Sequence, residues 1–254
     1  MRLMDVATAV PDPDLDIRLG PRPYLHPVRT LGGTTVTDAL CVDHPWHMGV
    51  SVALSDVGGV NFWGGRTYVR DLGYTWLDDH GRIRPAGDRL HWRDQRGRLL
   101  LVERRTLTAE AAPHGWRLRF EYALTAPAAT WLGSPATHGR AGGAGYGGFF
   151  WRGAPGDARA CTASREGEHA VNGSAEPWVA VTVGGAYTLV FHGLADDDRW
   201  FVRTGDYVGV CQALAFEKPL PLAAGATVAR RISVLVADGV LTREEASRAA
   251  APPS

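Results

Sequence analysis

The residues best suited to chemistry lie in one short segment, Asp43-His44-Pro45-Trp46-His47-Met48-Gly49. Imidazole titrates near neutral pH, so a histidine can accept and donate protons while a neighbouring carboxylate orients its ring. Two histidines and an aspartate within five residues can therefore transfer protons, bind a metal ion or grip a hydroxyl-rich ligand. Because Pro45 prevents regular ladder pairing, we expect a loop or the start of a strand here. The plainer alternative is a turn in which one imidazole caps the backbone and the other is solvated.

A second polar and aromatic segment, Arg22-Pro23-Tyr24-Leu25-His26-Pro27-Val28-Arg29, precedes the first. The guanidinium of Arg29 offers a planar pair of donors to a carboxylate, a phosphate or sugar hydroxyls, and we expect Tyr24 and His26 to contact substrate beside it. The flanking prolines predict that this segment takes no central position in a sheet. The alternative is a surface edge segment in which Arg29 forms an ordinary ion pair.

Three more residues complete the candidate site. His192 ends an apolar stretch, where it faces either a cleft or the core. Trp63 is one of nine tryptophans, an excess that hints at sugar binding through flat aromatic faces. Tyr146 lies in the glycine-rich stretch 142–148, which predicts either a hinged lid over a cleft or a mobile surface loop.

Strand signals dominate the elements that must position these residues. The clearest is residues 116–124, where apolar residues alternate with Arg117, Arg119 and Glu121, as expected of a strand with one buried face. Only one helix is predicted, over residues 242–250, where Thr242-Arg243-Glu244-Glu245 forms a capping box. The predicted strands cover residues 34–42, 48–54, 60–69, 89–94, 98–108, 116–124, 130–132, 148–152, 178–183, 187–192, 200–203, 208–216 and 226–236.

This pattern predicts an all-β protein with antiparallel sheets, because apolar and polar residues alternate along the strands. Hydrophobic residues make up 45% of the chain, enough for a full core, and no repeat with a period of roughly 20 to 50 residues indicates a propeller. We therefore predict a large two-sheet antiparallel β-sandwich with one short C-terminal helix. We expect residues 1–20 to form an arm or an edge strand, residues 21–240 a single sandwich domain, and residues 241–254 the helix and tail.

The composition argues against several classes of protein. The formal net charge is zero, whereas a nucleic-acid binder needs a basic surface. No run of about 18 apolar residues occurs, so we expect no membrane span, and the first ten residues lack the layout of a secretory signal, which favours the cytoplasm. Three scattered cysteines do not suit a disulfide framework or a cysteine zinc site.

We expect a small-molecule partner, and the oligomeric state stays open, with a homodimer as one option.

Several blocks of the sequence resemble the soluble bacterial PmoA-like family. Besides the segment from Asp43 to Gly49, the most specific of them, they are Arg22-Pro23-Tyr24-Leu25-His26-Pro27, Val60-Asn61-Phe62-Trp63-Gly64, Tyr146-Gly147-Gly148-Phe149-Phe150-Trp151-Arg152, Glu176-Pro177-Trp178-Val179 and Phe216-Glu217-Lys218-Pro219. The resemblance covers roughly residues 20–240. The usual block of that family is D-H-P-H-H-R-G, and this chain departs from it at Trp46 and Met48.

The resemblance implies a β-supersandwich similar to that of galactose mutarotases, and hence a role that involves carbohydrate. Mutarotases carry a catalytic Glu shortly after a Cys near the C-terminus, and the residues around Cys211 look like the flanks of that site. Ala213 stands where that Glu is expected. Either Glu217 takes the role from a shifted register, or ordinary mutarotation is not the reaction.

Three functions are therefore considered. The first is a carbohydrate-active enzyme, an epimerase or a lyase on an oxidised sugar, in a concave sheet cleft. His44 and His47 act there as general acid and base, Asp43 orients one imidazole, and Glu217 is a second base. The expected substrate-binding residues are Arg29, His26, Tyr24, Trp46, Trp63, Tyr146 and His192. The second function is a metal-assisted lyase or hydrolase, with a divalent ion held by His44, His47 and either His192 or Glu217. The third is a sugar-binding module without catalysis.

Overall fold

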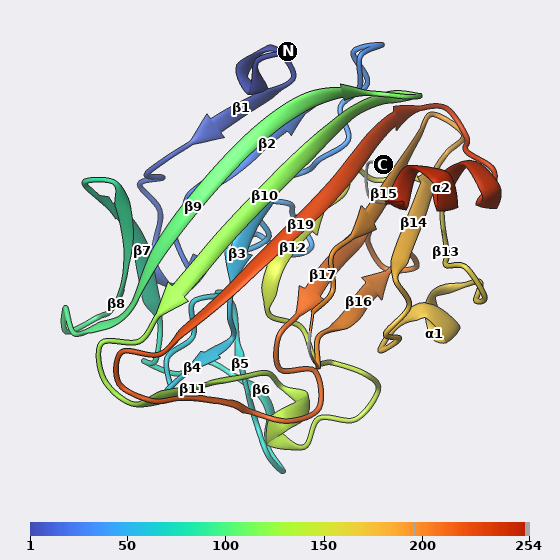
Figure 1. Cartoon of the computed structure of the whole chain (residues 1–254). Helices are drawn as coiled ribbons and strands as arrows, with labels where there is room; N and C mark the ends of the chain where they lie inside the picture. The colour runs from blue at the N-terminus through green and yellow to red at the C-terminus, as the bar shows by residue number, and fades with distance from the viewer. Residues whose placement is uncertain (196, 252–254) are drawn as a thin grey trace.

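Two large antiparallel sheets make up most of the computed structural model, which describes residues 1–195 and 197–251 (Figure 1). The six-stranded sheet has the order β1-β2-β3-β12-β17-β16, with strands Ala7–Val10, Tyr24–Val28, Val50–Ala53, Gly148–Arg152, Gly209–Ala213 and Arg199–Arg203. The eight-stranded sheet has the order β13-β14-β15-β19-β10-β9-β8-β7, with strands Ala158–Cys161, Trp178–Val183, Tyr187–His192, Thr227–Asp238, Gly115–Thr125, Leu99–Ala112, Arg89–Asp94 and Gly81–Ala86.

Smaller elements gather at the lower end of the view in Figure 1 and around the rim. One small sheet joins β18 (Leu220–Leu222), β11 (Thr130–Gly133) and β4 (Asp56–Val57), and a hairpin joins β5 (Thr67–Val69) to β6 (Gly73–Thr75). The helices are short: η1 (Leu3–Asp5), η2 (Ile17–Leu19), η3 (Ala136–His138), α1 (Glu168–Val171) and α2 (Arg243–Ala250).

The core lies between the two large sheets. Phe120 of β10 meets Phe149 of β12 with ring centroids 5.1 Å apart, and Trp151 of β12 meets Phe191 of β15 at 5.7 Å. All four side chains are almost completely buried. The alternation that predicted a strand over residues 116–124 therefore exists because one face of β10 packs against the six-stranded sheet. The predicted all-β antiparallel sandwich is confirmed.

Many strands have the expected bounds, and β8, β12, β14 and β15 match them residue for residue. Residues 60–69 form a strand only at their end, in β5, because Gly64 and Gly65 have φ values of +93° and +71° and turn the chain. Residues 34–42 form only isolated bridges, at Thr35 and Ala39, in place of the predicted strand.

β2 occupies an interior position in the six-stranded sheet, contrary to the expectation from its prolines. Its ladder with β1 pairs Val28 with Ala7 and Leu25 with Ala9, so two residues of β2 face one residue of β1 between these pairs. Pro27 lies in this bulge, where its missing N–H breaks no regular pair. A proline can therefore be accommodated inside a sheet at a register shift.

α2 covers part of the outer face of the eight-stranded sheet, where Ala246 packs in a cluster with Trp178, Val190 and Leu235. The predicted capping box is present, since Thr242 caps the helix and exchanges hydrogen bonds with Glu245. Residues 252–254 of the predicted tail lie outside the described residues. No helix in the described part of the chain has the length and apolar character needed to cross a membrane.

Candidate active site

The candidate site lies on the face of the six-stranded sheet that points away from the eight-stranded sheet. Along β12, Phe149 and Trp151 point into the core, and Phe150 and Arg152 therefore point to the opposite face. Phe150 pairs with Cys211 of β17 and packs in an aromatic cluster on that face. The chain thus provides a buried aromatic floor with one guanidinium at its edge.

The segment from Asp43 to Met48 is a loop held over this floor at its two ends. The N–H of Leu40 donates to the carbonyl of His47 (2.9 Å), and the N–H of Gly49 donates to the carbonyl of Asp38 (3.0 Å). The N–H of Arg152 donates to the carbonyl of Gly49 (2.8 Å), so the end of the loop is tied directly to β12.

The guanidinium of Arg152 donates hydrogen bonds to two polar residues of this loop. Its Nη2 donates to both carboxylate oxygens of Asp43 (3.0 and 2.9 Å), and its Nη1 donates to Nδ1 of His47 (3.1 Å). Partial burial acts to raise the pKa of Asp43, but the hydrogen bonds from His44 and Arg152 lower it to about 2. The Asp43 carboxylate is therefore ionised at neutral pH.

His47 is neutral, and its tautomer is fixed by its partner. A guanidinium has only donors, so Nδ1 of His47 must accept from Arg152 and the ring proton must lie on Nε2. The residue is only 2% exposed and packs against the rings of Trp63 and Phe150. Burial, together with the positive charges of His44 and Arg152, lowers the pKa of His47 well below 6.5.

His44 has the opposite arrangement of protons. Its Nδ1 lies 2.8 Å from Oδ2 of Asp43, and because an ionised carboxylate only accepts, Nδ1 carries the proton. In the neutral ring, the lone pair is therefore on Nε2. The rings of His44 and His47 are stacked, with centroids 4.6 Å apart and an interplanar angle of 6°. Two parallel imidazoles thus offer one free base and one N–H donor.

A second guanidinium, that of Arg22, is completely buried beneath the site. It donates to the carbonyls of Trp46 (3.0 Å) and Trp63 (3.0 Å), and to the hydroxyl of Ser51 (3.1 Å). Burial lowers the pKa of Arg22 to about 9. Arg22 therefore fixes the backbone of two aromatic residues of the site without an acidic partner in any of these contacts.

The two histidines open into a cavity of about 350 Å³. Its charged lining is mostly positive: Arg66, Arg140 and Arg203 face a single carboxylate, that of Asp206. Arg66 and Arg140 form no ion pair with any described carboxylate. The guanidinium of Arg140 lies instead over the ring of Tyr74, 4.9 Å from its centroid.

Two glycines allow aromatic rings to close around this cavity. A Cβ at Gly209 would lie 2.6 Å from Cε2 of Tyr207, and a Cβ at Gly65 would lie 2.6 Å from the ring of Trp46. Because neither glycine has a side chain, the Tyr207 ring can lie 4.7 Å from the guanidinium of Arg152, and the Trp46 ring can stand edge-on to His44.

Five of the expected site residues line this one cavity: His44, His47, Trp46, Trp63 and Tyr146. Asp43 lies directly behind them, in contact with His44 and Arg152. The glycine-rich stretch brings Tyr146 to the wall, where its ring packs on Trp63 with centroids 4.6 Å apart. The cavity thus brings together residues that are far apart in the sequence, from His44 before β3 to Tyr207 after β16.

The residues expected from the second segment lie elsewhere. Tyr24 lines a different depression beside Arg105. Nδ1 of His26 is hydrogen-bonded to the hydroxyl of Thr37 (2.9 Å). The side chain of Arg29 is exposed, and its carbonyl accepts from the indole of a core tryptophan. None of the three lines the histidine cavity.

His192 and Glu217 are also separate from this cavity. His192 lies on the outer face of the eight-stranded sheet, where Nη1 of Arg117 donates to its Nε2 (3.0 Å), and burial followed by the charge of Arg117 lowers its pKa to about 4. Glu217 is exposed beside Lys218. Because the two sheets separate His192 from His44 and His47, the predicted metal set is not assembled. In the described chain, no three His, Cys, Asp or Glu side chains are close enough to hold a metal ion.

Sequence reasoning did not assign Arg152, Arg22 or Tyr207 to the site. Arg152 ends the block that begins at Tyr146, and Arg22 begins the block that includes Tyr24, so both lie in segments already singled out. No sequence signal marks Tyr207, which reaches the site from the loop between β16 and β17.

Comparison with known proteins gives a family but no close relative. The model of a family described as "Family of unknown function (DUF6807)" matches residues 5–251. No curated protein sequence matches. Among solved structures, a polysaccharide lyase is 12% identical with a TM-score of 0.40, covering 92% of this chain and 33% of its own. A GH36 α-galactosidase from Geobacillus stearothermophilus is 13% identical with a TM-score of 0.28, covering 83% of this chain and 29% of its own. The chain thus spans about a third of each, and the structural resemblance to these carbohydrate-active enzymes is distant.

Proposed function

Because the chain belongs to DUF6807, a family of unknown function, we propose a function from the site itself: the protein is a carbohydrate-active enzyme that moves a proton at a carbon next to a carbonyl group of an oxidised sugar. The motif resemblance to the PmoA-like family and to mutarotase supersandwiches is consistent with this proposal. The reaction class is an epimerisation or a β-elimination.

One observation carries the proposal. The stacked rings of His44 and His47 have opposite proton positions, set by Asp43 and Arg152. A free lone pair on Nε2 of His44 is what a general base needs. An N–H on a buried neutral ring is a donor that can stabilise developing negative charge without itself being ionised.

The reaction uses these groups and solvent water. Nε2 of His44 takes the proton from the carbon beside the carbonyl, and the electron pair moves onto the carbonyl oxygen. The Nε2–H of His47 donates to that enolate oxygen. In an epimerisation, water delivers a proton to the opposite face of the carbon as the carbonyl reforms, and His44 releases its proton to solvent. In an elimination, the carbonyl reforms as the neighbouring C–O bond breaks, and the leaving oxygen takes the proton from His44.

The charge of the cavity supports an oxidised substrate. Arg203 pairs with Glu168 at 3.7 Å, whereas Arg66 and Arg140 line the cavity without an ion pair to a described carboxylate and outnumber the single carboxylate of Asp206. A surplus of positive charge stabilises an enolate, and it also attracts the carboxylate of a uronic acid. A neutral sugar accepts hydrogen bonds from these guanidiniums but supplies no negative charge to pair with them.

Proton exchange with solvent tests this function directly. Methyl glycosides of uronic acids and of sugars oxidised at a ring hydroxyl are incubated with the protein in D₂O, and loss of the C–H signal beside the carbonyl is followed by NMR. We expect His44→Ala to slow exchange by about 10²–10⁴-fold and His47→Gln by about 10²–10³-fold. The exposed residue His169 provides the control variant His169→Ala, which should exchange at the full rate. Full exchange in both His44→Ala and His47→Gln contradicts the proposal.

A sugar-binding module is the second candidate, because the rings of Trp46, Trp63 and Tyr207 line the same cavity. This function predicts sugar affinity that depends on these rings and not on histidine protonation. Affinity that is unchanged between about pH 5 and pH 8, without proton exchange in any oxidised sugar, favours the module over the enzyme.

A further inference from the structure

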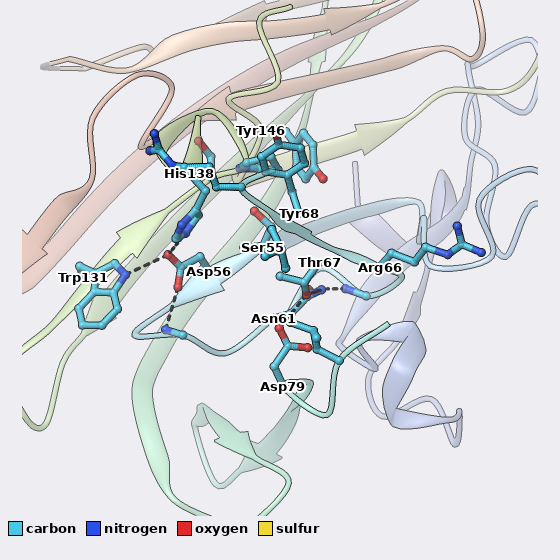
Figure 2. Close-up of a pocket in the computed structure, with 17 residues that line it drawn as sticks. Ser55, Asp56, Asn61, Arg66, Thr67, Tyr68, Asp79, Trp131, His138 and Tyr146 are labelled. Atoms are coloured by element: carbon cyan, nitrogen blue, oxygen red, sulfur yellow. Dashed lines mark hydrogen bonds and ion pairs between the residues drawn. The ribbon is translucent and has the colours of Figure 1, made fainter. Parts of the chain in front are cut away.

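A second cavity, of about 300 Å³, is shown with its lining residues in Figure 2. The two cavities share Gly64, Arg66 and Tyr146 in their walls. The hydroxyl of Tyr146 is hydrogen-bonded to that of Tyr74 (3.1 Å), which fixes the shared ring in place. A ligand of two sugar units that spans both cavities would cross this shared wall beside Tyr146.

One wall of the second cavity is held by Asp56. Its Oδ2 accepts from Nε1 of Trp131 (2.9 Å) and from Nε2 of His138 (2.8 Å), and its Oδ1 accepts from the N–H of Gly59 (2.8 Å), as the dashed lines of Figure 2 show. The indole of Trp131 is thus fixed in orientation although the residue is 44% exposed. A fixed, exposed aromatic ring offers an apolar surface to the C–H face of a sugar.

Two buried polar atoms of this cavity's lining residues have no hydrogen-bond partner among the described residues. They are Oγ of Ser55, a residue only 9% exposed, and Oδ1 of Asp79, which lies 3.5 Å from Nδ1 of the buried His80 and pairs with it when that ring is protonated. The other oxygen of Asp79 accepts from the hydroxyl of Thr67 (2.7 Å). Buried polar atoms without a partner are costly and rare, so the unpartnered hydroxyl of Ser55 in the lining of a cavity points to a ligand that completes it.

The chemistry of these two atoms selects the ligand. Asp79 supplies an acceptor, and Ser55 supplies a hydroxyl that can both donate and accept. Neutral sugar hydroxyls match both, and an anion finds no surplus of positive charge here, because Asp56 and Asp79 balance Arg66 and Arg70 in the lining. The arginine-rich histidine cavity and this one therefore favour different groups of one ligand.

We infer that the second cavity is a subsite for a neutral sugar unit joined to the unit that reacts beside His44. The substrate is then a glycoside with a sugar aglycone or an oligosaccharide, and not a free monosaccharide. The identity of the reacting unit rests on the proposed function, but the subsite itself does not.

Chain length tests the inference. The probes are methyl glucoside oxidised at a ring hydroxyl, the same oxidised unit within cellobiose and maltose, and unmodified cellobiose. Ser55→Val removes the unpartnered hydroxyl, and Leu77→Trp fills the cavity from a partly exposed lining position. Ser174→Val is the matched control, since Ser174 also has a buried hydroxyl without a partner in the described structure but does not line the cavity.

We expect the wild type to show a KM for the oxidised disaccharides about ten-fold below that for the methyl glucoside. Ser55→Val and Leu77→Trp should abolish this difference and leave the methyl glucoside unaffected, while Ser174→Val preserves it. Equal KM values for both chain lengths overturn the inference, as does a length effect that survives in both cavity variants. Cellobiose binding by calorimetry that both variants abolish, without proton exchange in any oxidised sugar, supports the subsite and overturns the proposed function. Failure of every probe to bind overturns the subsite.

Discussion

Nη1 of Arg152 lies 3.1 Å from Nδ1 of His47, and this contact decides which nitrogen of His47 carries the proton. We predict that ¹⁵N NMR finds Nδ1 unprotonated and Nε2 protonated from about pH 5 to pH 8, because burial and the adjacent guanidinium both oppose a second proton. In Arg152→Met, His47 should titrate at a higher pH than in the wild type. A wild-type His47 that becomes doubly protonated above pH 5 contradicts this prediction.

The contact between Arg152 and His47 also predicts that replacing Arg152 lowers the rate of proton exchange. A lysine at this position, which keeps the positive charge, should not restore that rate. Arg152→Met removes the side-chain donor to Nδ1 of His47 and leaves His44 as the side-chain donor to Asp43, and we expect proton exchange in oxidised sugars to fall on the order of 10²-fold. Arg152→Lys keeps the charge, but a point ammonium cannot donate along both directions of the fork. We expect this variant to recover little of the exchange rate, measured by NMR in D₂O. Full recovery with lysine contradicts a directional role.

Stability should depend on pH through two histidines, the buried His47 and the half-buried His192. Burial lowers the pKa of His47 well below 6.5 and that of His192 to about 4, so the unfolded chain binds protons that the folded chain does not. The free energy of unfolding therefore rises with pH and levels off above pH 6.5, with a slope of up to about 1.4 kcal/mol per pH unit for each histidine. His47→Gln and His192→Gln should each flatten the profile between pH 4 and pH 6.5 in denaturant titrations. His169→Ala, at an exposed position, should leave the slope unchanged.

Asp43 acts in the same direction as the two histidines but in a lower pH range, because its lowered pKa also leaves the unfolded chain with more bound protons. Its pKa is lowered to about 2 in the folded chain from an ordinary 3.8, so its contribution to stability is present above pH 4 and is lost as pH falls towards 2. We predict that Asp43→Asn lowers Tm at pH 7, and that the difference from wild type shrinks as pH falls from about 4 to about 2. A difference that stays constant over this range shows that Asp43 stabilises the loop without its charge.

Gly209 should tolerate no side chain. A Cβ there would lie 2.6 Å from the ring of Tyr207, so Gly209→Ala must displace that ring from Arg152, with an expected cost of about 1–3 kcal/mol in unfolding free energy. Gly205→Ala is the control, because its Cβ would meet only one atom, at 3.7 Å. Calorimetric melting of both variants checks the prediction, and similar Tm values for the two contradict it.

The sequence predicted those parts of the molecule that depend on local patterns. The alternation over residues 116–124 gives β10 because burial of one sheet face imposes a period of two. The loop with Asp43, His44 and His47 could be singled out because its reactive groups are neighbours in the chain and Pro45 excludes a regular strand.

The partners of that loop could not be predicted, because sheet register decides them. Arg152 is 105 residues from His47 in sequence, and it reaches the loop only because β12 pairs with β3 and presents alternate residues to the outer face. Arg29 shows the reverse case. It is closer to the loop in sequence than Arg152 is, but it lines no part of the cavity.

The order β1-β2-β3-β12-β17-β16 also bears on synthesis at the ribosome. Chains emerge from the N-terminus, and a nascent chain of about half the final length already contains Asp43, His44 and His47 but neither Arg152 nor Tyr207. Until those later residues are translated and paired, His47 lacks the hydrogen bond from Arg152 and the ring contact with Tyr207. Incomplete translation products should therefore lack the arrangement of proton donors and acceptors described above.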